Sequence, residues 1–421
     1  MSEQETSPPQ NKRFRRAVIP APGPIRTFAK MTLINTLGNG LYITIEAIFF
    51  TRSVNLTNHQ VALGLGTAAG VALFVNIPSG HLADKWKPRE LQAIFLVLQG
   101  ILMASFALVH SFAGFVTVAI MSAVFRNAGG AAGMVLISRL GVGEERVRIR
   151  AYQRSISNLG LSLGMGIAAV ALAVDTREAY VAMVVGNAIT FVGAAFFVLQ
   201  LPKISSTKTV GSAKTTQRLV ALRDRHFLIA TALNGCMSIQ FAIQSVGVPL
   251  WIVQYTHAPR WWVGVVMILN TTSVILLQVR FTRGTQDLTF AARAFRRSGL
   301  LIGAACLLYA STQGLNGTVA SVVLLMATVI DVLGELLSSS AGWAIGFGMA
   351  EEELQGQYQG VYSMSTGIAN IFGPLLVAST ALAIGGAGWI LLGGMFVLTG
   401  AAYPPLVRSY LRQRERMARP M

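Results

Sequence analysis

The sequence contains twelve predominantly apolar stretches of about twenty residues, and these constrain the fold more than any motif does. A stretch of this length forms a helix that can cross the hydrocarbon core of a lipid bilayer. Charged residues make up only 12% of the chain, about half of their share in soluble domains. We therefore predict an all-α integral membrane protein. The predicted spans are residues 28–50, 59–79, 91–109, 113–137, 152–174, 179–201, 227–254, 262–281, 295–313, 318–345, 358–384 and 387–407.

One long polar connection divides the chain into two halves with six spans each. It reads PKISSTKTVGSAKTTQRLVALRDR and is rich in Ser, Thr and Lys, which is typical of a linker. The predicted organisation is a tail over residues 1–26, a six-helix half over 27–201, the linker over 202–225, a second six-helix half over 226–407 and a tail over 408–421.

The basic residues lie almost entirely on one side of this predicted topology. Thirty of the 34 Lys and Arg residues lie in loops, tails or the adjoining span ends on the side that holds both termini, against three on the opposite side. Because basic loops stay in the cytoplasm, we expect both termini to be cytoplasmic and the chain to span the cell membrane, plasma or inner. The net charge of +17 then reflects topology in the lipid bilayer, so no nucleic-acid partner is predicted. We expect a monomer.

Two short segments indicate that the halves are related repeats. SNLGLSLGMG, at residues 157–166, resembles TGIANIFGPL, at residues 366–375, and each lies in the fifth span of its half. Twelve spans in two such halves are typical of secondary transporters built from repeats. Small residues let helix backbones approach closely in a membrane. We therefore predict helix-packing roles for Gly160, Gly164, Gly373 and Pro374.

The loop between the second and third spans carries the clearest motif. SGHLADKWKPRE, at residues 79–90, resembles the signature of the major facilitator superfamily at that loop. The matching positions are Gly80, Leu82, Ala83, Asp84, Lys85 and Arg89, whereas Lys87 and Pro88 depart from the pattern. The resemblance implies the major facilitator fold, with twelve transmembrane helices in two pseudo-symmetric halves. It also implies a latch that stabilises the outward-facing state, formed by Gly80, Asp84, Lys85 and Arg89.

The fourth predicted span resembles that of the proton-coupled antiporters of the same superfamily. FRNAGGAAG, at residues 125–133, contains Arg126 followed by glycines, as in their fourth helix. An arginine within the membrane indicates a functional site. In the fifth span, Gly160 and Gly164 keep the antiporter spacing, although Met165 stands where a proline is expected. The resemblance is therefore strongest to the twelve-span drug/proton antiporters.

Polar residues gather on the first, fourth, seventh and tenth spans, which line the central cavity in this family. In the first span, spacings of four, three and four residues place four polar side chains on one helix face. We assign substrate binding to Asn35, Asn39, Tyr42, Gln240 and Gln244. The alternative role for the Asn and Gln side chains is hydrogen bonding between helices.

Two acidic residues, Asp331 and Glu335, lie four residues apart in the tenth predicted span, so they share one face of a helix. A charged side chain at the bilayer centre costs about 2.5–3.5 kcal/mol, and burial disfavours the ionised form of a carboxyl group. We therefore predict that Asp331 and Glu335 face the cavity and carry protons. Glu46 and Arg126 are the further proton-coupling candidates.

The sequence predicts neither an enzyme nor a cofactor or metal site. It has no phosphate-binding P-loop, so ATP is not the expected energy source. Cys236 and Cys306 both lie in apolar stretches, without ligands at metal-binding spacing. We expect a small-molecule substrate and protons as partners, and export of hydrophobic or cationic drug-like compounds. The alternatives are transport of a sugar, peptide or secondary metabolite, and a non-transporting sensor or assembly protein on the same fold.

Overall fold

The structure is a computed structural model that describes residues 23–141, 143–203, 220–285 and 287–418, without the side chains of a few residues that include Asp84. Within these ranges the chain is helical and contains no β-strand. The first half comprises α1 (Pro24–Ile48), α2 (Asn58–Lys85), α3 (Pro88–Ser105), α4 (Phe112–Leu140), α5 (Glu144–Val174) and α6 (Arg177–Leu199). The second half comprises α7 (Arg225–Ser238), α8 (Gln240–Ala242), α9 (Val248–Tyr255), α10 (Trp262–Leu277), α11 (Leu288–Ser311), α12 (Gly317–Gly348), α13 (Gln355–Val377) and α14 (Gly386–Ala418).

These elements form twelve long helical segments among the described residues, because α7, α8 and α9 follow one another as a single interrupted helix. Ten of the segments are long and apolar enough to cross a membrane. The other two, α2 and α11, have 28 and 24 residues. Most of the predicted linker and the first tail lie outside the described residues, and α14 continues as a helix through residues 408–418 of the predicted second tail.

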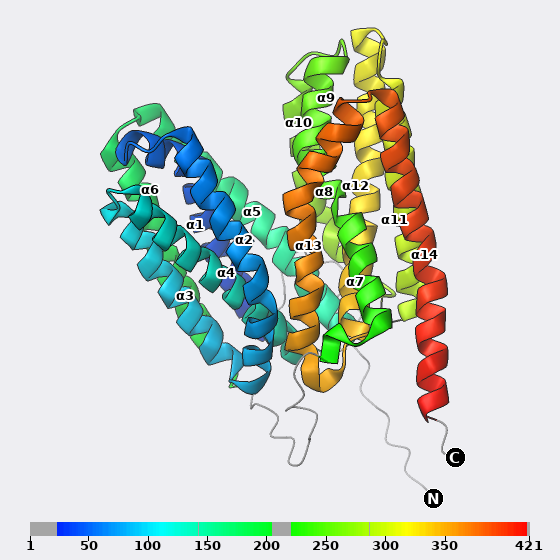
Figure 1. The fold of residues 1–421 in the computed structure, drawn as a ribbon, viewed down its shortest axis with the longest axis horizontal. Helices are drawn as coiled ribbons and strands as arrows, with labels where there is room; N and C mark the ends of the chain where they lie inside the picture. The colour runs from blue at the N-terminus through cyan, green and yellow to red at the C-terminus, as the bar shows by residue number, and fades with distance from the viewer. Residues whose placement is uncertain (1–22, 142, 204–219, 286, 419–421) are drawn as a thin grey trace, which may run out of the picture.

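Each half has its own hydrophobic core. Figure 1 shows the halves side by side, with α1–α6 in one and α7–α14 in the other. They lie close together at the end where α14 finishes, which we call the terminus side, and diverge toward the opposite end. The cores also interlock, since Val147 of α5 packs in the second core and Phe347 of α12 in the first. This arrangement joins the halves at the terminus side.

Glycines set the closest helix approach within the first half. A Cβ atom at Gly160 would lie 2.2 Å from Oγ1 of Thr36, and one at Gly164 would lie 2.1 Å from the carbonyl oxygen of Leu37. Both distances are too short for any side chain, so α5 packs against α1 only because these positions are glycine. In the second half, a Cβ atom at Gly373 would lie 2.9 Å from the Cβ of Ala242. Pro374 follows inside α13.

The seventh helical segment is interrupted just before a proline. Pro249 has no N–H to donate to the backbone four residues earlier, so a regular helix cannot continue through it. A π-helical turn at Ile243–Gly247 precedes this proline and separates α8 from α9. Such turns are frequent at functional sites. The interruption contains Gln244, which belongs to the polar cluster described next.

Candidate functional site

Two polar cavities lie between the halves, with volumes of about 540 Å³ and about 260 Å³. Residues from both halves line them, and the two cavities share part of their walls. The shared residues are Asn127, Met134, Arg150, Gln153, Ser157, Gln359 and Ser363. We therefore treat the pair as one central cavity. Its position between the halves is where a transporter built from two repeats binds its solute.

Where the structure describes the lining of the central cavity, its charged residues are arginines. Arg150 and Arg154 come from α5, and Arg126 comes from α4. Among the described residues that line either cavity there is no Asp or Glu. The remaining polar lining consists of Asn, Gln, Ser, Thr and Tyr side chains. The cavity wall therefore offers positive charge and neutral hydrogen-bonding groups.

Arg154 crosses the interface between the halves and forms an ion pair with Glu335 of α12. Its guanidinium also donates to the hydroxyl of Ser339 and lies over the ring of Phe241, 5.2 Å from the ring centroid. The Arg154 side chain is 18% exposed, whereas that of Glu335 is 1% exposed. Glu335 therefore lies behind the cavity wall, and Arg154 separates its carboxylate from the cavity.

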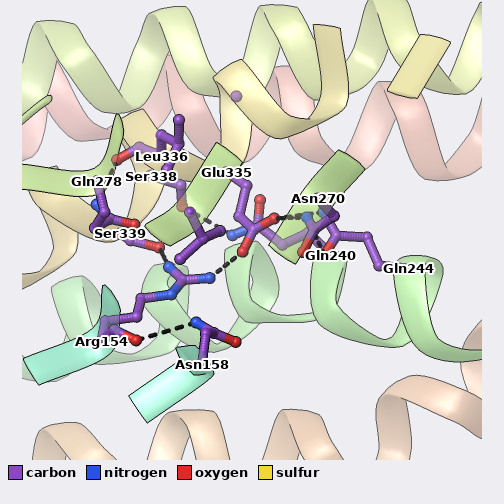
Figure 2. Close-up of polar contacts among 12 residues, drawn as sticks. Arg154, Asn158, Gln240, Gln244, Asn270, Gln278, Glu335, Leu336, Ser338 and Ser339 are labelled. Carbon is purple, nitrogen blue, oxygen red and sulfur yellow. Dashed lines mark hydrogen bonds and ion pairs between the residues drawn. The ribbon is translucent and has the colours of Figure 1, made fainter. Parts of the chain in front are cut away.

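The second carboxylate oxygen of Glu335 accepts two more hydrogen bonds. Gln244 Nε2 and Asn270 Nδ2 each lie 2.6 Å from Oε2 of Glu335 (Figure 2). Gln244 Nε2 also donates to Oδ2 of Asp331 at 3.1 Å, so this amide links the two acids. The other oxygen of Asp331, Oδ1, is buried and has no hydrogen-bond partner. A carboxyl group with an unpartnered buried oxygen is less costly in its neutral form than in its charged form.

The structure thus places Asp331 and Glu335 differently from the cavity-facing position expected from sequence. Asp331 is only 2% exposed, and neither acid belongs to the cavity lining. Both sit inside the second half, where partners from two other segments of that half reach them. The two acids share one face of α12, as their four-residue spacing predicts. This face of α12 is directed toward α10 and the interrupted helix, and not toward the cavity.

The predicted polar residues of the first half are divided between the cavity and its surroundings. Asn35 and Asn39 line the smaller cavity together with Arg126. Tyr42 instead stacks on Phe106 at a centroid distance of 5.8 Å. Glu46 lies beside Tyr42 and within electrostatic range of Arg126. Glu46 and Arg126 therefore form a separate group of charged residues within the first half.

The other predicted residues lie in the larger cavity and at the seal of the terminus side. Gln240 lines the larger cavity and donates to the Ser338 hydroxyl at 3.2 Å. Of the predicted latch, Gly80 lies directly against α13, and Arg89 donates to the carbonyl oxygen of Leu199 at 2.6 Å. Lys85 is exposed, and the Asp84 side chain lies outside the described residues.

Sequence reasoning missed the arginines of α5. The residues at 146, 150 and 154 are spaced by four, which places them on one helix face. The prediction counted them with the basic residues of the terminus side, because its span began only at residue 152 and Arg154 lies at the start of that span. In the structure α5 begins at Glu144, so all three are helical. Asn270 was missed because a lone Asn in an apolar span has no periodic signal.

The described residues contain no group of three or more metal-ligating side chains.

The sequence profile of the Major Facilitator Superfamily matches residues 29–374. A search of curated protein sequences found no match. Among solved structures, the chain is similar to the human organic anion transporter MFSD10 (TETRAN), with 16% identity, a TM-score of 0.68, and coverage of 90% of this chain and 98% of that one.

Two further solved structures share the fold. A bacterial homologue of the iron transporter ferroportin in an outward-facing state has 12% identity and a TM-score of 0.70, with coverage of 92% of this chain and 99% of that one. The proton:xylose symporter XylE has 14% identity and a TM-score of 0.61, with coverage of 90% and 94%. At these identities the similarity concerns the fold, and it confirms the predicted all-α architecture of two six-helix halves.

Proposed function

The chain belongs to the Major Facilitator Superfamily, so it is a membrane transporter that works by alternating access and not an enzyme, and we propose that proton binding to Glu335 drives the transport of a small polar organic molecule. The central cavity, with its Arg and amide lining, is the proposed solute site. The termini are proposed to face the cytoplasm of a cell membrane, because thirty of the 34 basic residues lie on their side. The active unit is proposed to be the monomer.

The proposal of proton coupling rests on one observation, the ion pair between Arg154 and Glu335, which joins the two halves. Alternating access requires the halves to exchange their contacts between two states. Protonation of Glu335 would remove one charge of this pair and weaken the connection. Proton binding would therefore favour separation of the halves at the terminus side. Asp331, linked to Glu335 through Gln244, is proposed as a second proton acceptor in the same cluster.

The sequence resemblance favoured export of hydrophobic cations in exchange for protons. Acidic or aromatic groups at the cavity wall would favour a cation. The described charged groups that line this cavity are arginines, and two of its aromatic rings, Trp343 and Phe241, already lie against Arg150 and Arg154. The composition of the wall supports a polar solute without a net positive charge. Glu46, which lies beside Tyr42 in the first half, remains the proposed acid for a cationic solute if one is carried.

The proposal can be tested in sealed proteoliposomes that enclose a pH-sensitive dye. Polar solutes of several classes are added outside, together with one fluorescent lipophilic cation, and proton movement into or out of the vesicle is recorded. We expect solute-dependent proton movement that the Glu335→Gln variant loses. Glu178→Gln, at an exposed acid in the first turn of α6, is the matched control and should retain it.

Two results would contradict the proposal. Equal proton movement with Glu335→Gln and with the unmodified protein would place the coupling site elsewhere, with Asp331 and Glu46 as the next residues to test. A lack of solute-dependent proton movement in the unmodified protein, with every class of solute, would favour the sensor or assembly role on the same fold.

A further inference from the structure

We propose that Arg150 forms an anion site in the central cavity and that Arg154 completes this site when Glu335 takes up a proton, so that a proton and an organic anion bind together. This inference rests on the proposed function, because it assigns the solute class and the sign of the coupling at the same site. A carboxylate, sulfonate or phosphate group on a small organic molecule has the chemistry that the site recognises.

Arg150 is the first part of the site, because it belongs to both cavities and has no carboxylate partner among the described residues. One terminal nitrogen donates to Gln153 on the same helix, while Nε is buried and has no hydrogen-bond partner. The guanidinium also lies over the ring of Trp343, 5.8 Å from the centroid, which restrains its plane. A buried donor on a permanent cation is costly unless an acceptor reaches it.

The residues around Arg150 favour binding of an anionic ligand over a cationic one. Asn127, Ser157, Gln359 and Ser363 line both cavities and can donate hydrogen bonds to an oxyanion. Arg126 lines the smaller cavity and adds positive charge. A planar guanidinium can bind a carboxylate or phosphate through two parallel hydrogen bonds, which a point charge cannot do.

Arg154 is the second part, and its charge is shared between two sides. On one side it pairs with Glu335, and on the other it lines the larger cavity. While Glu335 is ionised, its carboxylate neutralises Arg154, so that guanidinium attracts an incoming anion only weakly. When Glu335 is protonated, Gln244 and Asn270 can still donate to its carbonyl oxygen, and the charge of Arg154 is free to act on the cavity.

The other charged and titratable groups around this pair are few. Arg150 lies within electrostatic range of Arg154 on the same helix. Asp331 lies one turn from Glu335 and shares the Gln244 amide with it. Cys306 and Tyr309 of α11 lie within electrostatic range of Asp331. Of these groups, only Glu335 is ion-paired with a cavity-lining arginine, so its protonation is the event that changes the charge offered to the solute.

The sign of the coupling follows from linkage. If protonation of Glu335 increases anion affinity, then anion binding must increase the proton affinity of Glu335 by the same factor. The proton and the anion therefore enter the same conformational cycle together. This is cotransport, opposite to the antiport favoured by the sequence resemblance, and one proton with one monoanion carries no net charge.

The test measures ligand-induced thermal stabilisation of the full chain in nanodiscs at two pH values, about pH 5.5 and about pH 8. The probes are p-toluenesulfonate, benzoate and phenyl phosphate, with neutral p-toluenesulfonamide and cationic benzyltrimethylammonium as matched non-anionic ligands. We expect binding of at least one anion, about tenfold tighter at the lower pH. The sulfonate remains anionic at both values, so its pH dependence reports on the protein.

Three variants identify the groups involved. Glu335→Gln, which mimics the protonated acid, should bind the anion tightly at both pH values; this gain of affinity cannot result from misfolding. Arg154→Gln should bind it weakly and without pH dependence. Arg150→Gln should lose anion binding, whereas Arg150→Lys should recover part of it, since it keeps the charge without the planar fork.

The inference is overturned if no anion stabilises the protein at either pH, if benzyltrimethylammonium binds as tightly as the anions, or if Glu335→Gln binds the anion more weakly than the unmodified protein. Failure of the proposed function gives a different result. In that case anion binding would depend on pH as expected, but added solute would move no protons in proteoliposomes. Proton flux driven only by neutral polar solutes would keep the proposed function and exclude the anion site, whereas flux driven only by cations would contradict both.

Discussion

Gly80 of α2 and Gly356 of α13 meet at the terminus side with no room for a side chain between them. A Cβ atom at Gly80 would lie 2.0 Å from the carbonyl oxygen of Gly356. Because α2 belongs to the first half and α13 to the second, this contact is part of the seal that holds the two halves together. The backbone of one helix rests directly on that of the other.

A substitution of Gly80 should therefore open the terminus side. Gly80→Val forces α2 and α13 apart, and overpacking of this kind costs about 1–3 kcal/mol. The expected result is a shift toward the state that is open at the terminus side, measured as increased labelling of a cysteine placed at Ser363 in the cavity by a reagent added on that side. Gly70→Val is the matched control on α2, since a Cβ there meets nothing within 4 Å. Equal labelling in both variants would show that the glycine contact does not hold the seal.

The contact between α1 and α5 should be equally sensitive, but it should affect stability and not conformation. Gly164→Ala places a Cβ 2.1 Å from the carbonyl oxygen of Leu37 within one half. We expect a loss of about 1–3 kcal/mol in unfolding free energy, seen as a lower melting temperature in detergent. Gly166→Ala lies two residues away with nothing within 4 Å, so it should leave the melting temperature unchanged or raise it slightly. Equal effects of the two substitutions would contradict this packing role.

The fold could be predicted from sequence because its main determinant, apolar length, is a property of each segment alone. The spans at 113–137 and 318–345 fall within α4 and α12 of the structure. The position of the helix starts could not be predicted in the same way. The predicted fifth span began at residue 152, whereas α5 begins at Glu144, because Gly143 adopts a positive φ of 55° and two acidic residues favour the first turn.

The site was predicted in part. Asp331 and Glu335 stand out in any apolar span, so their burial could be expected from sequence alone. Their direction could not, because it depends on partners from distant segments: Arg154 is 181 positions away and Asn270 is 65 positions away. The four-residue spacing of the α5 arginines was present in the sequence, but the topology rule treats any basic residue near a span end as a loop charge.

The far end of α5 should show a pH-dependent contribution to stability. Asp175, between α5 and α6, accepts hydrogen bonds from the hydroxyl of Tyr180 and from Arg52. These two bonds hold the pKa of the Asp175 carboxyl below its ordinary value. A depressed pKa means that the stabilisation is complete above the unfolded-state pKa and disappears as the pH falls through the folded-state value.

The expected result is a difference between the unmodified protein and Asp175→Asn that is present near neutral pH and vanishes in acid. Melting temperatures of both proteins, recorded from neutral to acid pH, provide the measurement. Because the group is exposed, added salt should reduce the difference. Asn adopts the left-handed backbone conformation of Asp175, φ 51°, as readily as Asp does. A difference that persists at the lowest pH would therefore show that the stabilisation does not depend on the ionised carboxylate.

The ion pair between Arg146 and Glu352 should respond unequally to the loss of its two partners. The Arg146 side chain is 10% exposed, whereas that of Glu352 is 74% exposed. Arg146 Nε also donates to the carbonyl oxygens of Ser138 at 2.7 Å and Gly141 at 2.9 Å, which ties the end of α4 to α5. The single Nε–H is shared between these two oxygens, so Arg146→Gln removes one buried charge-assisted hydrogen bond, worth about 1.5–3 kcal/mol, together with the ion pair. Glu352→Gln removes only an exposed partner, and such pairs contribute about 0–1 kcal/mol.

We expect Arg146→Gln to lower the melting temperature strongly and Glu352→Gln to change it little. The double variant should behave like Arg146→Gln alone, because most of the stabilisation comes from the backbone contacts of the arginine and not from the carboxylate. The comparison of the four proteins forms a double-mutant cycle, which isolates the energy of the pair itself. A large effect of Glu352→Gln, equal to that of Arg146→Gln, would instead show that the ion pair between the halves supplies most of this stabilisation. In that case the attraction between the two charges would be the main contact that holds the terminus side closed.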